Sequence, residues 1–459
     1  PVKYFAVLLG MFLLADALLF LLRRRRKQGK WSKAEKPLRQ IVAAVLCGVL
    51  AVCCCFGAYA VMKLNQTISA VTKGTNVSAV IQVYVLQEDS AQTLEDAAGY
   101  TFGYTDTMDW KNTEETLLEL QNAFGGEVNT ENYLTPFAMI DALYNGEVQA
   151  IILNQSYVSI LEGLEEYSDF SERVRSLHEH AVMMEPSEEK PQIDAGKVAE
   201  EPFVLYLSGS DTRSTMLDTS RSDVNILAAV NPSTKQILLV NTPRDYYVAN
   251  PAGGGAMDKL THCGNYGTQC SMDALAALYN EDIEYYAQIN FTGFETLIDA
   301  IGGVTVNSET SFSAQGYYFQ EGENELDGAA ALAFARERYA LAGGDNDRGK
   351  NQMRVITGVI QKLASGALLA NYSQILDSLE GMFATNFPME AVARLVKMQL
   401  EDMASWNIVS YAVTGYNGEE TTYSTPGLYC YVMYPDEETV EHATELIDMV
   451  MAGEILPNE

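Results

Sequence analysis

Basic residues are scarce in this chain, which has 459 residues, 30 lysines and arginines, 61 aspartates and glutamates, and a formal charge of −31. Only 20 of the cations, against 59 acids, lie after residue 62. A surface of this charge repels nucleic acids, so we expect no nucleic-acid partner. A polyanionic ligand must therefore be bound by local clusters of cations. With 47% hydrophobic and 10% aromatic residues, the composition also excludes a disordered chain.

Cysteines are few as well. Four of the seven lie within the apolar segment 40–62, where packing is their expected role and lipidation the alternative. The other three, Cys263, Cys270 and Cys430, lack the spacing of zinc ligands. Because an odd number cannot all pair, we expect one structural disulfide and one free thiol, with the pairing left open.

Two segments near the start lack charge almost entirely. Residues 1–22 and 40–62 are each long and apolar enough to cross a bilayer, and nine cations lie in the loop 23–39 between them. The positive-inside rule makes that loop cytoplasmic, so both segments are predicted transmembrane helices and the rest of the chain is extracellular. A signal peptide is the alternative, but the basic cluster follows the first apolar run. This orientation places Pro1 outside, so we expect a further apolar segment upstream.

The first extracellular unit is predicted to be an α/β accessory domain over residues 79–185, after a polar linker at 63–78 and before an acidic linker at 186–202. Its apolar and polar residues alternate as strands at 79–87 and 100–105, with a helix expected at 91–99. Further signals are a helix capped by Asn112 or Thr113 that ends near Phe124, a helix beginning at Thr135-Pro136, and an Asn145-Gly146 turn.

The phrases TLEDAAGYTFGYT and ALYNGEVQAIIL in this unit resemble one lobe of a type II solute-binding protein. One lobe forms no interlobe cleft, so a spacer or docking role is favoured over a ligand sensor. His178 and His180 flank Glu179, but two histidines alone indicate a solvated surface more than a metal site.

From Phe203 onward, polar residues follow apolar strands in a pattern that indicates chemistry. FVLYLSGSDTRS places Asp211 and Arg213 after one strand, and RSDVNILAAV places Arg221 and Asp223 before another. Carboxylates are the hard oxygen ligands that Mg²⁺ prefers, usually one or two per ion beside phosphate and water. Spacing alone favours the alternative, in which both carboxylates cap turns.

Arginines recur in three later segments. ILLVNTPRDYYV contains Arg244 and Asp245; DGAAALAFARERY contains Arg336 and Arg338; DNDRGKNQMRVI contains Asp345, Asp347, Arg348 and Gln352. Arg336 and Arg338 share a face if their segment is extended, and Arg348 and Gln352 share one if theirs is helical. Converging guanidinium groups suit a diphosphate, whereas the alternative is a network of salt bridges to the abundant acids.

The ordered set GSDTRS, SRSDVNILA, VNTPRDYYV, DKLTH, YYAQINFTGFETLIDAIGGVTVN, LDGAAALAFARERY and DNDRGKNQMRVI resembles the LytR-CpsA-Psr (LCP) family of cell-wall ligases. The resemblance covers about residues 203–365, and 366–459 is similar to the C-terminal continuation of that domain. The fold class it implies is α/β, an α/β/α sandwich. The activity it implies is transfer of a glycopolymer (a teichoic acid, a capsule or another wall polysaccharide) from undecaprenyl diphosphate to peptidoglycan.

The resemblance also assigns residues. Asp211 and Asp223 would bind Mg²⁺, and Asp245 or Asp347 would be the base that removes the acceptor proton. Arg244 would be catalytic and grip the diphosphate. The remaining diphosphate ligands would be Arg213, Arg221, Lys259, Arg336, Arg338, Arg348 and Gln352. Attack of a sugar hydroxyl on phosphorus needs no covalent enzyme intermediate.

A lipid carrier also requires an apolar channel. Phe291, Phe294, Phe312 and residues 317–319 are candidates to line it, although each also fits an ordinary core. Two other functions use the same residues: hydrolysis of the lipid diphosphate by water, and a wall-associated regulator or scaffold that binds a polyanionic polymer without turnover.

Overall fold

The computed structural model describes residues 79–182, 198–213, 217, 219–364 and 372–457. The two predicted membrane segments, their basic loop and the linker at 63–78 lie outside the described residues. Within the described part of the chain, no helix is both long enough and apolar enough to span a bilayer.

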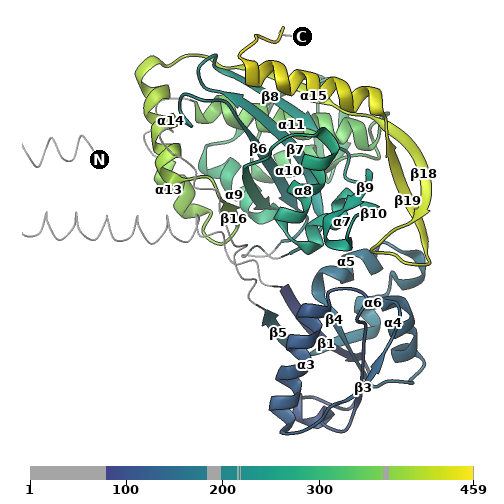
Figure 1. The fold of residues 1–459 in the computed structure, drawn as a ribbon. Coiled ribbons are helices and arrows are strands. Elements are labelled where there is room, and N and C mark those ends of the chain that lie inside the picture. Colours follow the sequence, from purple (N-terminus) through teal and green to yellow (C-terminus); the bar gives the residue numbers. More distant parts are fainter. Residues whose placement is uncertain (1–78, 183–197, 214–216, 218, 365–371, 458–459) are drawn as a thin grey trace, which may run out of the picture. The chain divides into compact units, whose positions relative to one another are not determined.

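The first module, residues 79–182, is built on a five-stranded sheet of order β3-β2-β4-β1-β5, drawn in purple and blue in Figure 1. Its strands are β1 (Ala79–Leu86), β2 (Thr101–Tyr104), β3 (Asn129–Asn132), β4 (Ala150–Asn154) and β5 (Val174–Val182). Its α-helices are α3 (Trp110–Phe124), α4 (Pro136–Tyr144), α5 (Val158–Leu161) and α6 (Phe170–Arg173). The mixed α/β character agrees with the sequence pattern.

Local signals decided most of these elements. Thr135 caps α4, because its Oγ1 accepts the backbone N–H of Ala138 at 3.1 Å and Pro136 occupies the first turn. The helix expected at 91–99 is wrong except for one short 3-10 turn at Glu95–Ala97. Asp89 and Asp96 accept backbone N–H groups of neighbouring residues there and stabilise turns in place of a helix. α3 begins at Trp110, earlier than the expected cap.

His178 and His180 lie on β5 and face helix α3. His178 Nε2 is 3.1 Å from Glu119 Oε1, and His180 pairs with the same carboxylate. The imidazoles are 24% and 18% exposed, so the expectation of a solvated pair is wrong. Their spacing of two residues on a strand turns both toward the helix. Among the described residues, no cluster of three or more metal-binding side chains is arranged to hold an ion.

The burial of Asp109, which precedes α3, leads us to predict that the stability of the first module depends measurably on pH. Burial raises its pKa from 3.8 to about 6, although Asn154 and Asn112 donate to it. The folded state therefore retains the proton more tightly, so this group lowers stability as pH rises from about 4 to about 6. The cost above that interval is of the order of 3 kcal/mol.

Asp109→Asn should remove this cost and stabilise the first module at about pH 7.5. Asn also tolerates the left-handed backbone of residue 109, with φ of 52°. Urea unfolding followed through Trp110 fluorescence at about pH 5 and about pH 7.5 measures it. Wild-type and variant curves that differ equally at both pH values would contradict the assignment.

The second module, residues 198–457, is built on a six-stranded sheet of order β16-β11-β6-β7-β8-β17. These strands are β6 (Phe203–Ser210), β7 (Ser222–Asn231), β8 (Gln236–Asn241), β11 (Tyr285–Asn290), β16 (Phe383–Thr385) and β17 (Asn407–Ala412). The inner pairs β6–β7 and β7–β8 are antiparallel, whereas β11 runs parallel to β6 and β17 parallel to β8. The carboxyl ends of β6, β8 and β11 consequently share one edge of the sheet.

The remaining strands form small two-stranded sheets around this core. They are β9 (Tyr247–Asn250), β10 (Ala256–Lys259), β12 (Val304–Ser308), β13 (Phe312–Ala314), β14 (Tyr317–Phe319), β15 (Gly322–Leu326), β18 (Gly415–Thr421) and β19 (Tyr429–Pro435). The helices are α7 (Leu260–Cys263), α8 (Thr268–Tyr279), α9 (Phe291–Ala300), α10 (Gly328–Arg336), α11 (Asp345–Leu363), α13 (Tyr372–Ser378), α14 (Met389–Asp402) and α15 (Glu437–Ala452).

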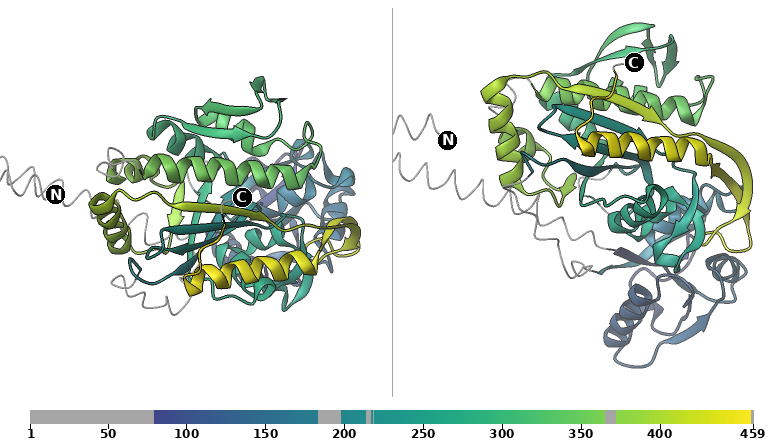
Figure 2. Two further views of the ribbon diagram at one scale, coloured as in Figure 1. Left: turned by 90° about the horizontal axis from the view of Figure 1, so that it is seen from above. Right: turned by 45° about the horizontal axis from the view of Figure 1, so that its top comes forward.

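Helices cover both faces of the six-stranded sheet. Alternate residues of its strands point to opposite faces, so Tyr206 and Leu238 pack with α8 and α15, whereas Leu205 and Leu239 pack with α11 and α14. Figure 2 shows α11 in green and α15 in yellow on opposite sides of the sheet. The second module is therefore the expected α/β/α sandwich, and residues 372–457 contribute helices and strands to it, as expected for a C-terminal continuation of the domain.

The expected disulfide is absent. Cys263, Cys270 and Cys430 are all free thiols in the described residues. Cys263 and Cys270 lie in the hydrophobic core between the sheet and helices α7 and α8. An apolar core of this size stabilises the module without a cross-link. The number of cysteines was therefore a poor basis for expecting a disulfide.

Candidate functional site

The site lies where several strand ends meet. Asp211 follows β6, Asp223 is near the start of the antiparallel neighbour β7, and Arg244 follows β8 by three residues. A register shift at Gly209 and Ser210 bends β6 beside Val224, and the N–H of Thr242 bonds to the carbonyl of Asn225 at 2.9 Å. These pairings bring together side chains that are up to 33 residues apart in the sequence.

The two carboxylates are each paired with an arginine. Arg221 donates to Asp211 Oδ2 at 2.6 Å, and Arg244 donates to Asp223 Oδ1 at 2.7 Å. Burial and the neighbouring Asp223 raise the pKa of Asp211. Burial also acts to raise the pKa of Asp223, but Arg244, Arg348 and Arg221 outweigh it and the pKa is lowered. Asp223 therefore remains ionised at neutral pH.

The two carboxylates have the proximity and the free oxygens that a divalent cation requires. They are close enough for Asp223 to repel a second negative charge on Asp211, and each accepts a hydrogen bond from an arginine on only one of its oxygens. The other two oxygens are available as hard ligands, which matches the one or two protein carboxylates that Mg²⁺ usually takes. Phosphate and water would complete its coordination.

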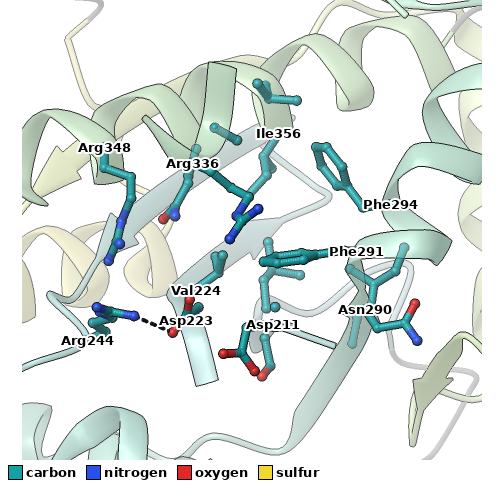
Figure 3. Close-up of a pocket in the computed structure, with 18 of the residues that line it drawn as sticks. Asp211, Asp223, Val224, Arg244, Asn290, Phe291, Phe294, Arg336, Arg348 and Ile356 are labelled. Atoms are coloured by element: carbon teal, nitrogen blue, oxygen red, sulfur yellow. Dashed lines mark hydrogen bonds and ion pairs between the residues drawn. The ribbon is translucent and has the colours of Figure 1, made fainter. Parts of the chain in front are cut away.

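Further cations converge on the same space from helices α10 and α11. Figure 3 shows Arg244, Arg336 and Arg348 pointing toward the space beside Asp223. Arg348 is 7% exposed and pairs with Asp345 at 2.5 Å, and Arg336 stacks on the Phe291 ring at 4.4 Å. Gly349 allows α11 to lie close to Asn241 of β8, since a Cβ at residue 349 would lie 2.2 Å from the Asn241 amide nitrogen.

Some of these cations have unsatisfied donors. The Nε atoms of Arg221 and Arg244 are buried and have no hydrogen-bond partner in the described residues. Burial acts to lower the pKa of Arg244, but Asp223 and Asp245 raise it above its ordinary value, so the guanidinium stays charged. Buried donors without acceptors are costly, so an anion that accepts from them would be bound strongly.

All these groups line one cavity of about 1330 Å³. An apolar part of its wall lies between the sheet and helices α11 and α14, where it includes Leu205, Ala287, Val359, Leu395 and Trp406. Phe291 and Phe294 also line it, as expected, whereas Phe312 and Phe319 belong to a separate core and Tyr317 and Tyr318 are exposed. The cavity is therefore amphiphilic, with charges at one part and hydrocarbon along the rest.

The structure brings together most of the residues expected from the sequence. The cavity is lined by Asp211, Arg221, Asp223, Arg244, Asp245, Lys259, Arg336, Arg338, Arg348 and Gln352. Asp245 lies between Lys259 Nζ at 3.2 Å and Arg244 Nε at 3.5 Å. Arg336 and Arg338 both line the cavity: Arg336 is the last residue of helix α10, and Glu337 between them has an extended backbone, with φ of −68° and ψ of 133°.

Two expected residues are not part of this lining. Arg213 is 57% exposed and pairs with Glu295 at 3.4 Å. Asp347 accepts the backbone N–H of Gly343 at 2.7 Å and faces Lys350, so it stabilises the start of α11. Both corrections have the same cause, because closeness in sequence to a site residue does not set the direction of a side chain.

The sequence alone did not identify Phe291 as a platform for Arg336, or Asp258 and His262 as a buried pair. The spacing of four residues between Asp258 and His262 gave no reliable signal, because Asp258 lies on strand β10 and His262 on helix α7.

An amphiphilic cavity of this kind in an α/β/α sandwich suits a ligand that has an anionic head and a hydrocarbon chain. The family model of the LytR_cpsA_psr family matches residues 167–444, and the chain belongs to that family.

Relatives of known name are similar to part of this chain. The Enterococcus faecalis polyisoprenyl-teichoic acid–peptidoglycan teichoic acid transferase TagU is 38% identical over 197 residues, which cover 42% of this chain and 65% of the relative. The Bacillus subtilis TagU is 32% identical over 218 residues, covering 47% and 69%. The crystal structure of B. subtilis TagU matches at 27% identity with a TM-score of 0.44, and covers 56% of this chain and 100% of that one.

Proposed function

We propose that this chain is an extracellular phosphotransferase that joins an anionic glycopolymer, carried on a polyprenyl diphosphate, to peptidoglycan. The observation that carries the proposal is the amphiphilic cavity, because its charged part suits a diphosphate and its apolar part suits the attached hydrocarbon chain. The TagU relatives carry the name of this reaction with a teichoic acid as the polymer. We propose a teichoic acid here too, with a capsule or other wall polysaccharide as the alternative.

The buried arginines would act on the charge that develops during transfer. Arg244 and Arg348 lie beside Asp223, and Arg221 beside Asp211, so their guanidinium groups are fixed before the substrate enters. Fixed donors in a site shielded from water stabilise the oxygens of a transferring phosphoryl group without reorganisation. Lys259 and Gln352 would extend the same cradle.

Asp211 and Asp223 would hold Mg²⁺. Bound Mg²⁺ would neutralise charge on the phosphate oxygens. Each aspartate already pairs with an arginine, Asp211 with Arg221 and Asp223 with Arg244. The bound cation would therefore lie at a fixed position relative to both guanidinium groups.

We also propose that residues 1–22 and 40–62 anchor the chain in the membrane with the second module outside. The apolar runs and the basic loop between them support this orientation, and a lipid-linked substrate requires a protein close to the bilayer.

The full chain in a detergent that also disperses the donor tests this function. It is incubated with Mg²⁺ and a polyprenyl diphosphate oligosaccharide, with and without peptidoglycan fragments, and the phosphorus products are followed. Polyprenyl monophosphate and a phosphodiester-linked glycan that both depend on the acceptor support the transferase. Monophosphate formed equally without acceptor indicates a hydrolase, and saturable binding without product indicates a scaffold.

The metal site makes a separate prediction. Asp211→Asn should weaken the stabilisation of the protein by Mg²⁺ with inorganic pyrophosphate, and should lower turnover by about 10²-fold or more. Thermal unfolding with and without Mg²⁺ provides a readout independent of activity. Asp347→Asn is the matched control, because Asp347 lies outside the cavity lining. An equal Mg²⁺-induced shift in wild type and Asp211→Asn would contradict the assignment.

A further inference from the structure

A buried aspartate–histidine pair lies beside the same cavity, and its histidine, His262, lines the wall. Asp258, at the end of β10, is fully buried, and His262, in α7, is 5% exposed. His262 Nδ1 is 2.7 Å from Asp258 Oδ1. The second carboxylate oxygen accepts from Asn250 Nδ2 at 3.0 Å and Ser424 Oγ at 2.6 Å. The pair is thus held by three separate segments of the second module.

The hydrogen bonds fix which ring nitrogen carries the proton. Burial acts to raise the pKa of Asp258, but His262, Ser424 and Asn250 outweigh it and the pKa is lowered, so Asp258 is a carboxylate. A carboxylate only accepts, so Nδ1 must donate, and in the neutral ring Nε2 keeps its lone pair. The described residues offer Nε2 no hydrogen-bond partner, and His262 lines the cavity.

Backbone hydrogen bonds join helix α7 directly to the segment that contains Arg244. The N–H of Thr261 bonds to the carbonyl of Arg244 at 2.8 Å, and the N–H of Leu260 bonds to the carbonyl of Tyr246 at 2.8 Å. Lys259, which precedes the helix, pairs with Asp245. His262 therefore belongs to the same rigid unit as the diphosphate cradle.

We propose that His262 is the general base of the transfer reaction and that Asp258 is its positioning residue; the inference rests on the proposed function. Nε2 takes the proton of the acceptor hydroxyl as its oxygen bonds to the phosphorus attached to the glycan. The bond from that phosphorus to the bridging oxygen breaks, and its electron pair leaves with polyprenyl phosphate. Asp258 stabilises the imidazolium, which returns its proton to water.

The other candidate base is less suitable on geometric grounds. The Asp245 carboxylate already faces two cations, Lys259 at 3.2 Å and Arg244 at 3.5 Å. Each oxygen of that carboxylate therefore already faces a cation, Oδ1 facing Lys259 and Oδ2 facing Arg244. The Nε2 atom of His262 has no such partner among the described residues and is open to an acceptor hydroxyl.

His262→Gln in the full chain tests the role. Glutamine can still donate to Asp258 but cannot act as a base, so kcat should fall by about 10²–10⁴-fold while donor affinity stays within about 3-fold. His442→Gln is the matched control, because His442 is an exposed histidine on α15 that pairs only with Glu445 in the described residues. Asp258→Asn should also lower kcat and should shift the acid limb of the pH–rate profile.

A second measurement uses the unaltered protein. The chain has four histidines, so the His262 ring can be assigned by NMR after histidine-selective labelling. Its titration should coincide with the acid limb of wild-type kcat, below which activity is lost. A folded His262→Gln with near wild-type kcat, or an acid limb that does not follow the ring, would overturn the inference. Wild-type protein that forms no phosphodiester would instead refute the transferase function, and this inference with it.

Discussion

Arg244→Ala is expected to lower kcat/KM for the diphosphate donor by about 10³-fold or more in a protein that remains folded. Arg244 is a buried donor to Asp223 and lines the charged part of the cavity. Its loss removes a fixed positive charge from the phosphoryl oxygens and leaves Asp223 with less compensation. Removal of one partner of a buried pair costs about 3–5 kcal/mol, so thermal unfolding must accompany the kinetics.

Two controls make this result interpretable. Arg244→Lys keeps the charge but loses the planar fork, so activity should recover only in part. Arg354→Ala removes an arginine from α11 that pairs with Glu309 and does not line the cavity, and should leave turnover within about 3-fold of wild type. A folded Arg244→Ala with wild-type kcat/KM would refute the cradle. Lost turnover with intact donor affinity would separate catalysis from binding.

Ala287→Trp is expected to discriminate between donors by the length of their hydrocarbon chain. Ala287 is a half-buried residue on β11 that lines the apolar part of the cavity, so an indole there occupies space that the lipid requires. Exclusion of one five-carbon isoprene unit forfeits about 4 kcal/mol at about 0.8 kcal/mol per carbon, which corresponds to roughly 10²–10³-fold in KM.

We expect a donor with two isoprene units to bind the variant within about 3-fold of wild type. Ala287 pairs with Leu207, four residues before Asp211, so a chain held at the charged part must run along several residues of the strand before it meets the indole. Ala452→Trp, at an exposed position near the end of α15, is the control for adding an indole. KM measured for long and short donors with each protein gives the comparison. Equal losses for both donors would mean that Ala287→Trp disturbs the charged part of the site and that the apolar part does not hold the lipid.

The sequence by itself indicated most of the helices and strands, and most of the charged side chains that line the cavity. Apolar strands that end in Asp211 or Pro243-Arg244 placed those residues at a sheet edge, since a strand's polar flank must lie where the strand leaves the core. The helical spacing of Arg348 and Gln352 placed both on one face of α11, and both line the cavity. The ordered motifs indicated membership of the LytR-CpsA-Psr family, and the match of the family model over residues 167–444 confirms it.

Only the tertiary structure decided which of those side chains converge. Arg213 is two residues from Asp211 but turns to Glu295, and Asp347 is next to Arg348 but stabilises its own helix. The apolar cavity likewise depends on which faces of β6, β11, α11 and α14 meet. Sequence patterns report local periodicity and burial, whereas convergence depends on chain segments far apart in the sequence that pack against one another. The pairing of His262 with Asp258 has both origins, since their spacing is local but the buried position of the carboxylate comes from Asn250 and Ser424.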